Sequence, residues 1–194
     1  MAHQVFHSET YVLSSHPFGE ANKILHLLTK EFGMITATAQ GLRADRSKLR
    51  YSLQDCGRAR VSIVRGKHSW KVTGAESEEQ YWVLWREDRE KLALFRRIGI
   101  LLIRLLPGEE QHEEVYTTLQ LLVSALKDAT TKEKLESIET ISVARIVHAL
   151  GYVEETALNT ALLAPTEPFP ASITPSVKNL LITTINTALA HSQL

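Results

Sequence analysis

The segment RARVSIVR, residues 58–65, decides how the first part of this 194-residue chain folds. Its residues alternate between polar and apolar, with Ala59, Val61 and Ile63 at every second position. Because successive side chains of a β-strand point to opposite faces, this alternation predicts a strand with one buried and one solvated face. The predicted solvated face carries Arg58 and Arg60.

Four further β-rich segments accompany this strand, at residues 10–15, 22–29, 34–40 and 69–75. Glycine and proline residues that favour turns separate several of them. The third places small alanines on one face, which suits a tightly curved sheet. Five short strands within residues 1–76 predict a small antiparallel β-barrel of the OB type.

A basic loop, GLRADRSKLR at residues 41–50, follows the third predicted strand. Four cations this close repel one another unless an anion or solvent lies between them, so the loop is a candidate phosphate contact. The alternative is a solvated surface loop, because short Lys/Arg runs are common. Arg58 and Arg60 could equally be ordinary solvent-facing residues. The candidate nucleic-acid contacts are Lys23, Arg43, Arg46, Ser47, Lys48, Arg50, Arg58 and Arg60.

Aromatic residues near these cations matter because OB barrels bind single strands with a positive groove and rings that stack on bases. Tyr51 and Trp70 lie near the basic segments in the sequence. An aromatic residue on a strand more often belongs to the core. The sequence leaves open which aromatic residues stack.

The formal net charge is zero, but the charges are unevenly distributed. Residues 1–75 hold 11 basic and 5 acidic residues, a net charge of +6, which leaves −6 for residues 76–194. The split predicts different partners for the two parts. A single cysteine, Cys56, excludes an intramolecular disulfide and a zinc site built from several thiolates. With no signal-like N-terminus and no apolar run long enough to cross a bilayer, we expect a soluble, cytoplasmic protein.

From residue 77 onward the apolar residues recur with a helical period. We predict helices at residues 78–85, 88–106, 110–129, 132–150 and 176–191. Gly151 would end the fourth helix in the left-handed conformation, and Thr174 would cap the last one. The prediction is an α+β multidomain chain, with an OB-fold domain at residues 1–76 and an all-α domain at residues 77–194.

Residues 11–54 resemble the N-terminal domain of the RecO recombination-mediator proteins of DNA repair. The resemblance lies in the His-Pro-Phe-Gly-Glu turn at 16–20, the LLT-x-x-x-G hairpin at 27–33 and the A-x-G-x-R…S segment at 39–47. The stretch ARIVHALGY, residues 144–152, also resembles the RecO helical domain. The resemblance implies an OB domain that binds single- and double-stranded DNA. It further implies DNA annealing and recombinase loading, with RecR and the C-terminal tail of single-stranded DNA-binding protein as partners.

Candidate protein contacts lie in the predicted helix 88–106, at Arg96, Arg97 and Arg104. An acidic tail that ends in an apolar residue needs an apolar groove beside a cation. The alternative is a solvated helix face whose arginines pair with nearby acids.

Catalytic and cofactor motifs are missing from the sequence. It contains no G-x-x-x-x-G-K-[ST], H-E-x-x-H or G-x-S-x-G motif. Many RecO proteins carry zinc-binding cysteines that this chain lacks, so the resemblance is to a short form. We expect no enzyme, no cofactor and no metal. The competing hypothesis is an OB-fold adaptor that binds RNA or a protein without a role in DNA repair.

Overall fold

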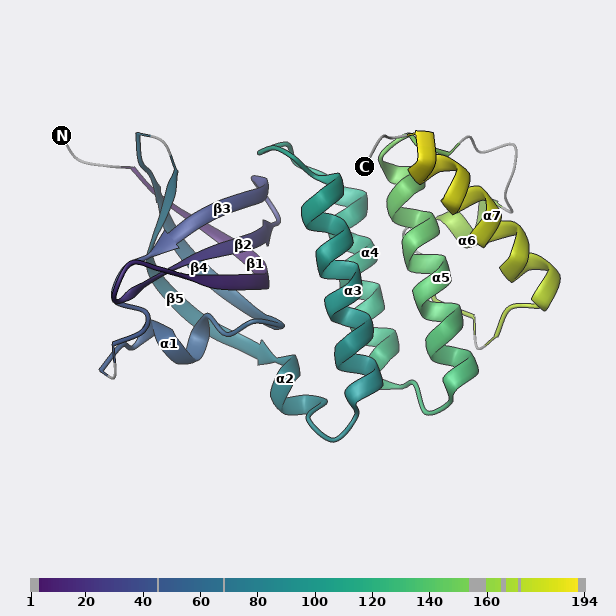
Figure 1. The fold of residues 1–194 in the computed structure, drawn as a ribbon, viewed down its shortest axis with the longest axis horizontal. Coiled ribbons are helices and arrows are strands. Elements are labelled where there is room, and N and C mark those ends of the chain that lie inside the picture. The colour runs from purple at the N-terminus through teal and green to yellow at the C-terminus, as the bar shows by residue number, and fades with distance from the viewer. Residues whose placement is uncertain are drawn as a thin grey trace. The chain divides into compact units, whose positions relative to one another are not determined.

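The computed structural model describes residues 4–44, 46–67, 69–153, 160–164, 167–170 and 172–191. The chain forms two compact units, residues 1–111 and 112–194. Figure 1 shows strands in the N-terminal part and helices after them. The predicted α+β class, an OB-type barrel followed by helices, is confirmed. The first unit extends beyond the predicted boundary at residue 76, since it also contains two helices.

Five strands close into a barrel in the order β1-β2-β3-β5-β4. The strands are β1 (Val5–Phe18), β2 (Asn22–Thr29), β3 (Gly33–Ala39), β4 (Gly57–Arg65) and β5 (Trp70–Gln80). Neighbouring strands are antiparallel except β3 and β5, which are parallel. A five-stranded barrel of this kind is the OB arrangement.

Strand β1 is longer than the predicted segment 10–15 because it serves two neighbours. It pairs with β4 from Val5 to Val12 and with β2 from Thr10 to Phe18. The register shifts between Val12 and Ser14, and such an irregularity bends a strand so that one strand can close a barrel.

The prediction of a helix over all of residues 78–85 is wrong, because strand β5 occupies the first part of that segment. The strand continues to Gln80, and only α2 (Tyr81–Leu84) is helical. Glu79 and Gln80 pair with Arg58 and Gly57 of β4. Acidic residues that resemble a helix start are therefore cross-strand neighbours of basic ones, and this pairing outweighs local helix preference.

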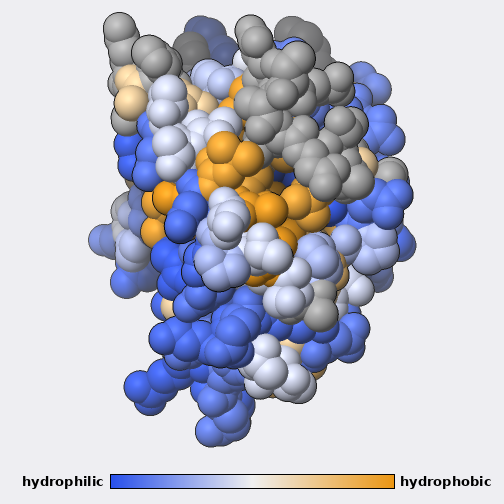
Figure 2. All heavy atoms as spheres, turned by 90° about the vertical axis from the view of Figure 1, so that its right-hand side faces the viewer, coloured by the Kyte–Doolittle hydropathy of each residue, from blue (hydrophilic) through white to orange (hydrophobic). Residues whose placement is uncertain are grey.

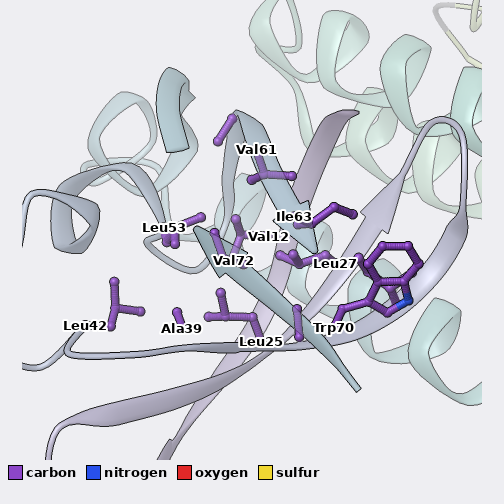
Figure 3. Close-up of a cluster of buried hydrophobic side chains, with 13 residues drawn as sticks. Val12, Leu25, Leu27, Ala39, Leu42, Leu53, Val61, Ile63, Trp70 and Val72 are labelled. Atoms are coloured by element: carbon purple, nitrogen blue, oxygen red, sulfur yellow. The ribbon is translucent and has the colours of Figure 1, made fainter. Parts of the chain in front are cut away.

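The barrel interior is filled by alternating side chains of its strands. Ala59, Val61 and Ile63 of β4 are fully buried, as their alternation predicted. Figure 3 shows Leu42 and Leu53 at one end of this cluster and Trp70 at the other. Fully burying a leucine side chain stabilises a fold by about 1.5–3 kcal/mol, so the two leucines anchor the segment between β3 and β4.

Helix α3 (Arg89–Leu105) packs on the barrel through aromatic side chains. The Tyr81 ring centroid lies 6.3 Å from Tyr11 of β1, 5.3 Å from Phe95 of α3 and 5.0 Å from Trp85. Such pairs contribute about 0.5–1.5 kcal/mol each beyond area burial. Asp88 caps the helix, since its Oδ1 accepts a hydrogen bond from Lys91 N at 3.3 Å.

The second unit contains α4 (Glu113–Lys127), α5 (Lys132–Ala149), α6 (Thr160–Leu163) and α7 (Pro175–His191). The caps of α5 and α7 are confirmed: Gly151 has φ 75°, and Val177 N donates to Thr174 Oγ1 at 3.4 Å. Helix α4 begins three residues later than predicted. Lys178 of α7 forms an ion pair with Glu136 of α5.

Apolar side chains are exposed on α7, where Leu180 and Ile182 reach 52% and 39% exposure. Figure 2 views the side of the molecule that carries α7 and shows apolar atoms gathered in one patch among hydrophilic ones. Within the described ranges, every helix is too short or too polar to pass through a lipid bilayer.

Candidate nucleic-acid interface

The basic loop, residues 41–50, and the short helix α1 (Leu49–Ser52) close one end of the barrel. Leu42 and Leu53 are buried in the core and Leu49 packs against it. The intervening cations are exposed, namely Arg43, Arg46, Lys48 and Arg50. The segment is thus anchored by its leucines and presents its charges to solvent.

Hydrogen bonds fix the start of the loop against the turn between β1 and β2 and against the first residue of β2. Gly41 N donates to Asn22 Oδ1 at 2.9 Å, and Arg43 N donates to Ala21 O at 2.9 Å. Gly41 has φ 64°, a conformation that favours glycine. The Arg43 guanidinium donates to Gly19 O at 3.3 Å. In the A-x-G-x-R motif, Gly41 therefore allows the left-handed turn, and Arg43, two residues later, bonds to the turn between β1 and β2.

A cavity of about 390 Å³ lies beside this loop and brings together cations that are distant in sequence. Lys23 of β2, Arg43 and Arg50 line it, together with Gln54 and two leucines. Among the described residues of its lining there is no Asp or Glu, so these carry a net charge of +3. Asp45 lies outside the described residues. Lys23 is held in place by Ser15, whose Oγ accepts a hydrogen bond from Lys23 Nζ at 3.0 Å.

The other predicted loop residues lie outside this cavity lining. Arg46 and Lys48 are exposed on the same loop, and Ser47 is half-buried with its N donating to Ala44 O at 3.0 Å. They extend the basic surface along the loop.

Arg58 and Arg60 of β4 lie in a different setting, because each is paired with carboxylates. Arg58 Nη2 lies 2.7 Å from Glu9 Oε2, and Arg58 Nε lies 3.0 Å from Glu78 Oε2. Arg60 Nη2 lies 3.4 Å from Glu78 Oε1. Two acids thus balance two arginines on this strand face, which weakens its attraction for phosphate.

The two aromatic candidates differ in exposure. Trp70 is a core residue, 2% exposed, with its ring 5.7 Å from Phe6 and under the guanidinium of Arg65. Tyr51 is 64% exposed and directly follows Arg50. Phe18, the last residue of β1, was not among the stacking candidates and is 53% exposed beside Gly19. An aromatic residue next to a Gly-containing turn was the signal that could have found it.

The three arginines predicted to contact a protein do not share one setting. Arg96 lines a second cavity that also includes Lys23. Burial raises the pKa of the Cys56 thiol, and the neighbouring Arg96 guanidinium offsets part of that rise. Arg97 and Arg104, seven residues apart, share a neighbouring face about 100° around the helix from Arg96.

Two histidines lie together on the outer face of β1 and β2. The His16 and His26 rings are 5.6 Å apart, and His26 Nδ1 lies 3.0 Å from Ser14 Oγ. Burial, and then the proximity of His16, lower the pKa of His26 below 6.5. His26 is therefore neutral at neutral pH and adds no charge to the basic surface. Within the part of the chain that the structure describes, no three His, Cys, Asp or Glu side chains gather as metal ligands would.

Comparison with known families agrees with this geometry. Residues 1–81, which span the barrel and its loop, match the family described as recombination protein O N terminal. This N-terminal part of the chain belongs to the RecO family. Its relatives include proteins named DNA repair protein RecO from Moorella thermoacetica, Gloeothece citriformis and Desulfitobacterium hafniense.

These RecO relatives are 32%, 30% and 29% identical to the chain over 123, 133 and 113 residues, respectively. The matches cover 63%, 66% and 58% of this chain but only 45%, 47% and 41% of the relatives. The chain thus spans less than half the length of these RecO proteins. The family match, residues 1–81, includes the barrel and its basic loop.

Proposed function

We propose that this chain is a recombination mediator in DNA repair that binds DNA through its basic loop. The observation that carries the proposal is the cavity where Lys23, Arg43 and Arg50 gather, with no acid among its described lining residues. Three cations on an anchored backbone favour an anionic ligand with several charges, as a nucleic-acid strand has. The printed names of the relatives supply the DNA repair context.

The proposed contacts are made to phosphates and do not distinguish one base sequence from another. Arg43, Arg46, Lys48 and Arg50 offer exposed charges, and contacts to phosphate position a strand without reporting its bases. A strand held by its phosphates keeps its base edges available, which is what annealing to a complementary strand requires. Tyr51 offers a stacking surface, and such stacking contributes roughly 1–3 kcal/mol per base.

Protein partners form the second part of the proposal. We infer a contact with a RecR-like protein and with the acidic tail of single-stranded DNA-binding protein, through which recombinase is loaded. Arg97 and Arg104 of α3, with Ile100 between them at 60% exposure, combine cations with an apolar side chain as such a tail requires. We propose no enzymatic step and a cytoplasmic location.

A salt titration of single-stranded DNA binding tests the proposal. Four phosphate contacts give a slope of about −3 in a plot of log affinity against log salt concentration. The variant Arg46→Glu with Lys48→Glu should weaken binding to all sequences and leave the thermal unfolding midpoint unchanged. Lys67→Glu with Lys71→Glu is the matched control, since both residues are exposed in the same unit and the charge change is equal.

Unaltered binding by the loop variant would remove the loop from the site. A flat salt response would instead support the competing adaptor hypothesis, in which the barrel binds a protein. Tighter binding of an RNA strand than of the same DNA sequence would favour an RNA adaptor.

A further inference from the structure

A second cavity, of about 640 Å³, adjoins the loop cavity within the first unit. Lys23 and Gln54 line both cavities, so the two form one continuous surface. Beyond Lys23 the lining passes to the segment around α2 and to helix α3. The additional cations there are Arg86, Arg89 and Arg96.

The charge of this continuous surface is strongly positive. Its described lining residues include six cations and one acid, Asp55, a net charge of +5. Arg86 pairs with its neighbour Glu87 at 3.2 Å, but both side chains are more than two-thirds exposed. An exposed pair of this kind holds its partners weakly, so Arg86 can exchange Glu87 for another anion.

Helix geometry aligns two of these arginines. Arg89 and Arg96 are seven residues apart, close to two full turns, and so lie on the same face of α3. The aromatic contacts of Tyr81 and Phe95 hold this helix against β1. The cations are therefore carried by a fixed element.

Trp82 adds an aromatic surface to the second cavity. Trp82 and Trp85 lie three residues apart, yet Trp85 is 4% exposed and stacks on Tyr81, whereas Trp82 is 41% exposed and lines the cavity. The combination of an accessible indole with several cations is the one that single-stranded nucleic-acid sites use.

We propose that the second cavity continues the path of a single strand from the basic loop across Lys23 to α3. Arg86, Arg89 and Arg96 contact phosphates there, and Trp82 stacks on a base. Stacking on Trp82 requires an unpaired base, so this segment is specific for single strands. The inference rests on the proposed function, because it extends the same DNA site. Arg96 thereby becomes a nucleic-acid contact, separate from Arg97 and Arg104.

The test compares short and long thymidine oligonucleotides, at the two ends of the roughly 4–16-nucleotide range that OB folds occupy. Trp82→Ala should weaken binding of the long oligonucleotide about tenfold or more and leave the short one unchanged. Trp82→Phe should restore much of the loss, because it keeps an aromatic face. Arg86→Gln with Arg89→Gln should reduce the salt slope for the long oligonucleotide by about 1.4.

A fluorescence measurement tests the contact with Trp82 without relying on changes in affinity. The chain has three tryptophans, and Trp70 and Trp85 are buried. Long oligonucleotides should quench the tryptophan emission of the native protein, and Trp82→Phe should abolish that quenching. The thermal unfolding midpoint of Trp82→Ala should equal that of the native protein, since Trp82 is not a core residue.

The outcomes separate this inference from the proposed function. If the Arg46 and Lys48 variant loses both oligonucleotides while the Trp82 and arginine variants bind like the native protein, the path ends at the loop and the inference is overturned. If the native protein binds neither oligonucleotide, the proposed function fails as well. A third outcome is that the Arg86 and Arg89 variant loses binding of the acidic tail peptide of single-stranded DNA-binding protein while it binds both oligonucleotides as the native protein does. That result would identify a peptide site and contradict the inference.

Discussion

The basic loop and the outer face of β4 are both rich in arginine, but they differ in what surrounds those arginines. Arg43 and Arg50 line a cavity with Lys23 and without an acid among the described lining residues. Arg58 and Arg60 lie within 4 Å of Glu9 and Glu78. The acids beside Arg58 and Arg60 offset the charge of that strand face, whereas the described lining of the loop cavity keeps a net charge of +3. Local charge balance, more than the number of arginines, distinguishes the two regions.

Two aromatic residues also differ in their surroundings, since Trp70 is buried in the barrel and Tyr51 is exposed beside the loop. Substituting Trp70 should give the largest change in the free energy of unfolding. Trp70→Ala removes a core side chain beside Arg65 and should reduce the free energy of unfolding by about 3–5 kcal/mol. Tyr51→Ala, beside the loop, should leave the free energy of unfolding within about 0.5 kcal/mol of the native value. It should weaken single-strand binding by roughly 1–3 kcal/mol. Urea unfolding and fluorescence anisotropy measure the two quantities.

The aromatic comparison would break if Trp70→Ala folded with native stability, or if Tyr51→Ala bound DNA as tightly as the native protein. Tyr51→Phe is the control for Tyr51, because it keeps the ring and removes only the hydroxyl.

Removing the acids of the strand face should convert that face into a binding surface. Glu9→Gln with Glu78→Gln removes two carboxylates that contact Arg58 and Arg60, so single-strand affinity should rise about fivefold at low salt, which corresponds to ~1 kcal/mol. The free energy of unfolding should fall by a similar amount as half-buried ion pairs are lost.

Glu113→Gln with Glu114→Gln is the control for this change, since it removes two exposed acids of α4 and leaves the strand face unchanged. An equal rise in affinity in both variants would mean that net charge, and not release of Arg58 and Arg60, controls binding.

The smallest expected effect concerns the two neighbouring histidines of β1 and β2. The pKa of His26 in the folded protein lies below 6.5, because burial and then His16 disfavour its charged form. Between the folded and unfolded pKa values the unfolded chain binds more protons, so stability falls as the pH drops below about 6.5. His26→Gln should lose less stability than the native protein between pH 7.5 and pH 5.5 in thermal unfolding. Equal losses would show that other groups dominate.

The local parts of the fold were predictable from sequence, and the long-range parts were not. Alternation in β4 depends only on neighbouring residues, and burial of Ala59, Val61 and Ile63 confirmed it. The ion pair of Arg58 with Glu9 joins residues 49 positions apart, which no local pattern reveals. The helix predicted from residue 78 was wrong for the same reason, since pairing with β4 keeps Glu79 and Gln80 in a strand.

The site was predictable in part. The spacing of cations indicated the loop, but the contribution of Lys23 to its cavity depends on how β2 and the loop meet. Trp82 and Trp85 lie three residues apart, a spacing that within the predicted helix 78–85 would suggest one shared buried face. The helix is a single turn between β5 and α3, so only Trp85 reaches the aromatic cluster.

The most direct measurement is the salt dependence of single-strand binding in two neutralising variants of equal charge. Arg46→Gln with Lys48→Gln should reduce the slope of log affinity against log salt by about 1.4, the loss of two phosphate contacts. Arg58→Gln with Arg60→Gln should leave the slope as in the native protein. A loss of slope in the strand variant, with a native slope in the loop variant, would contradict the assignment of DNA binding to the loop.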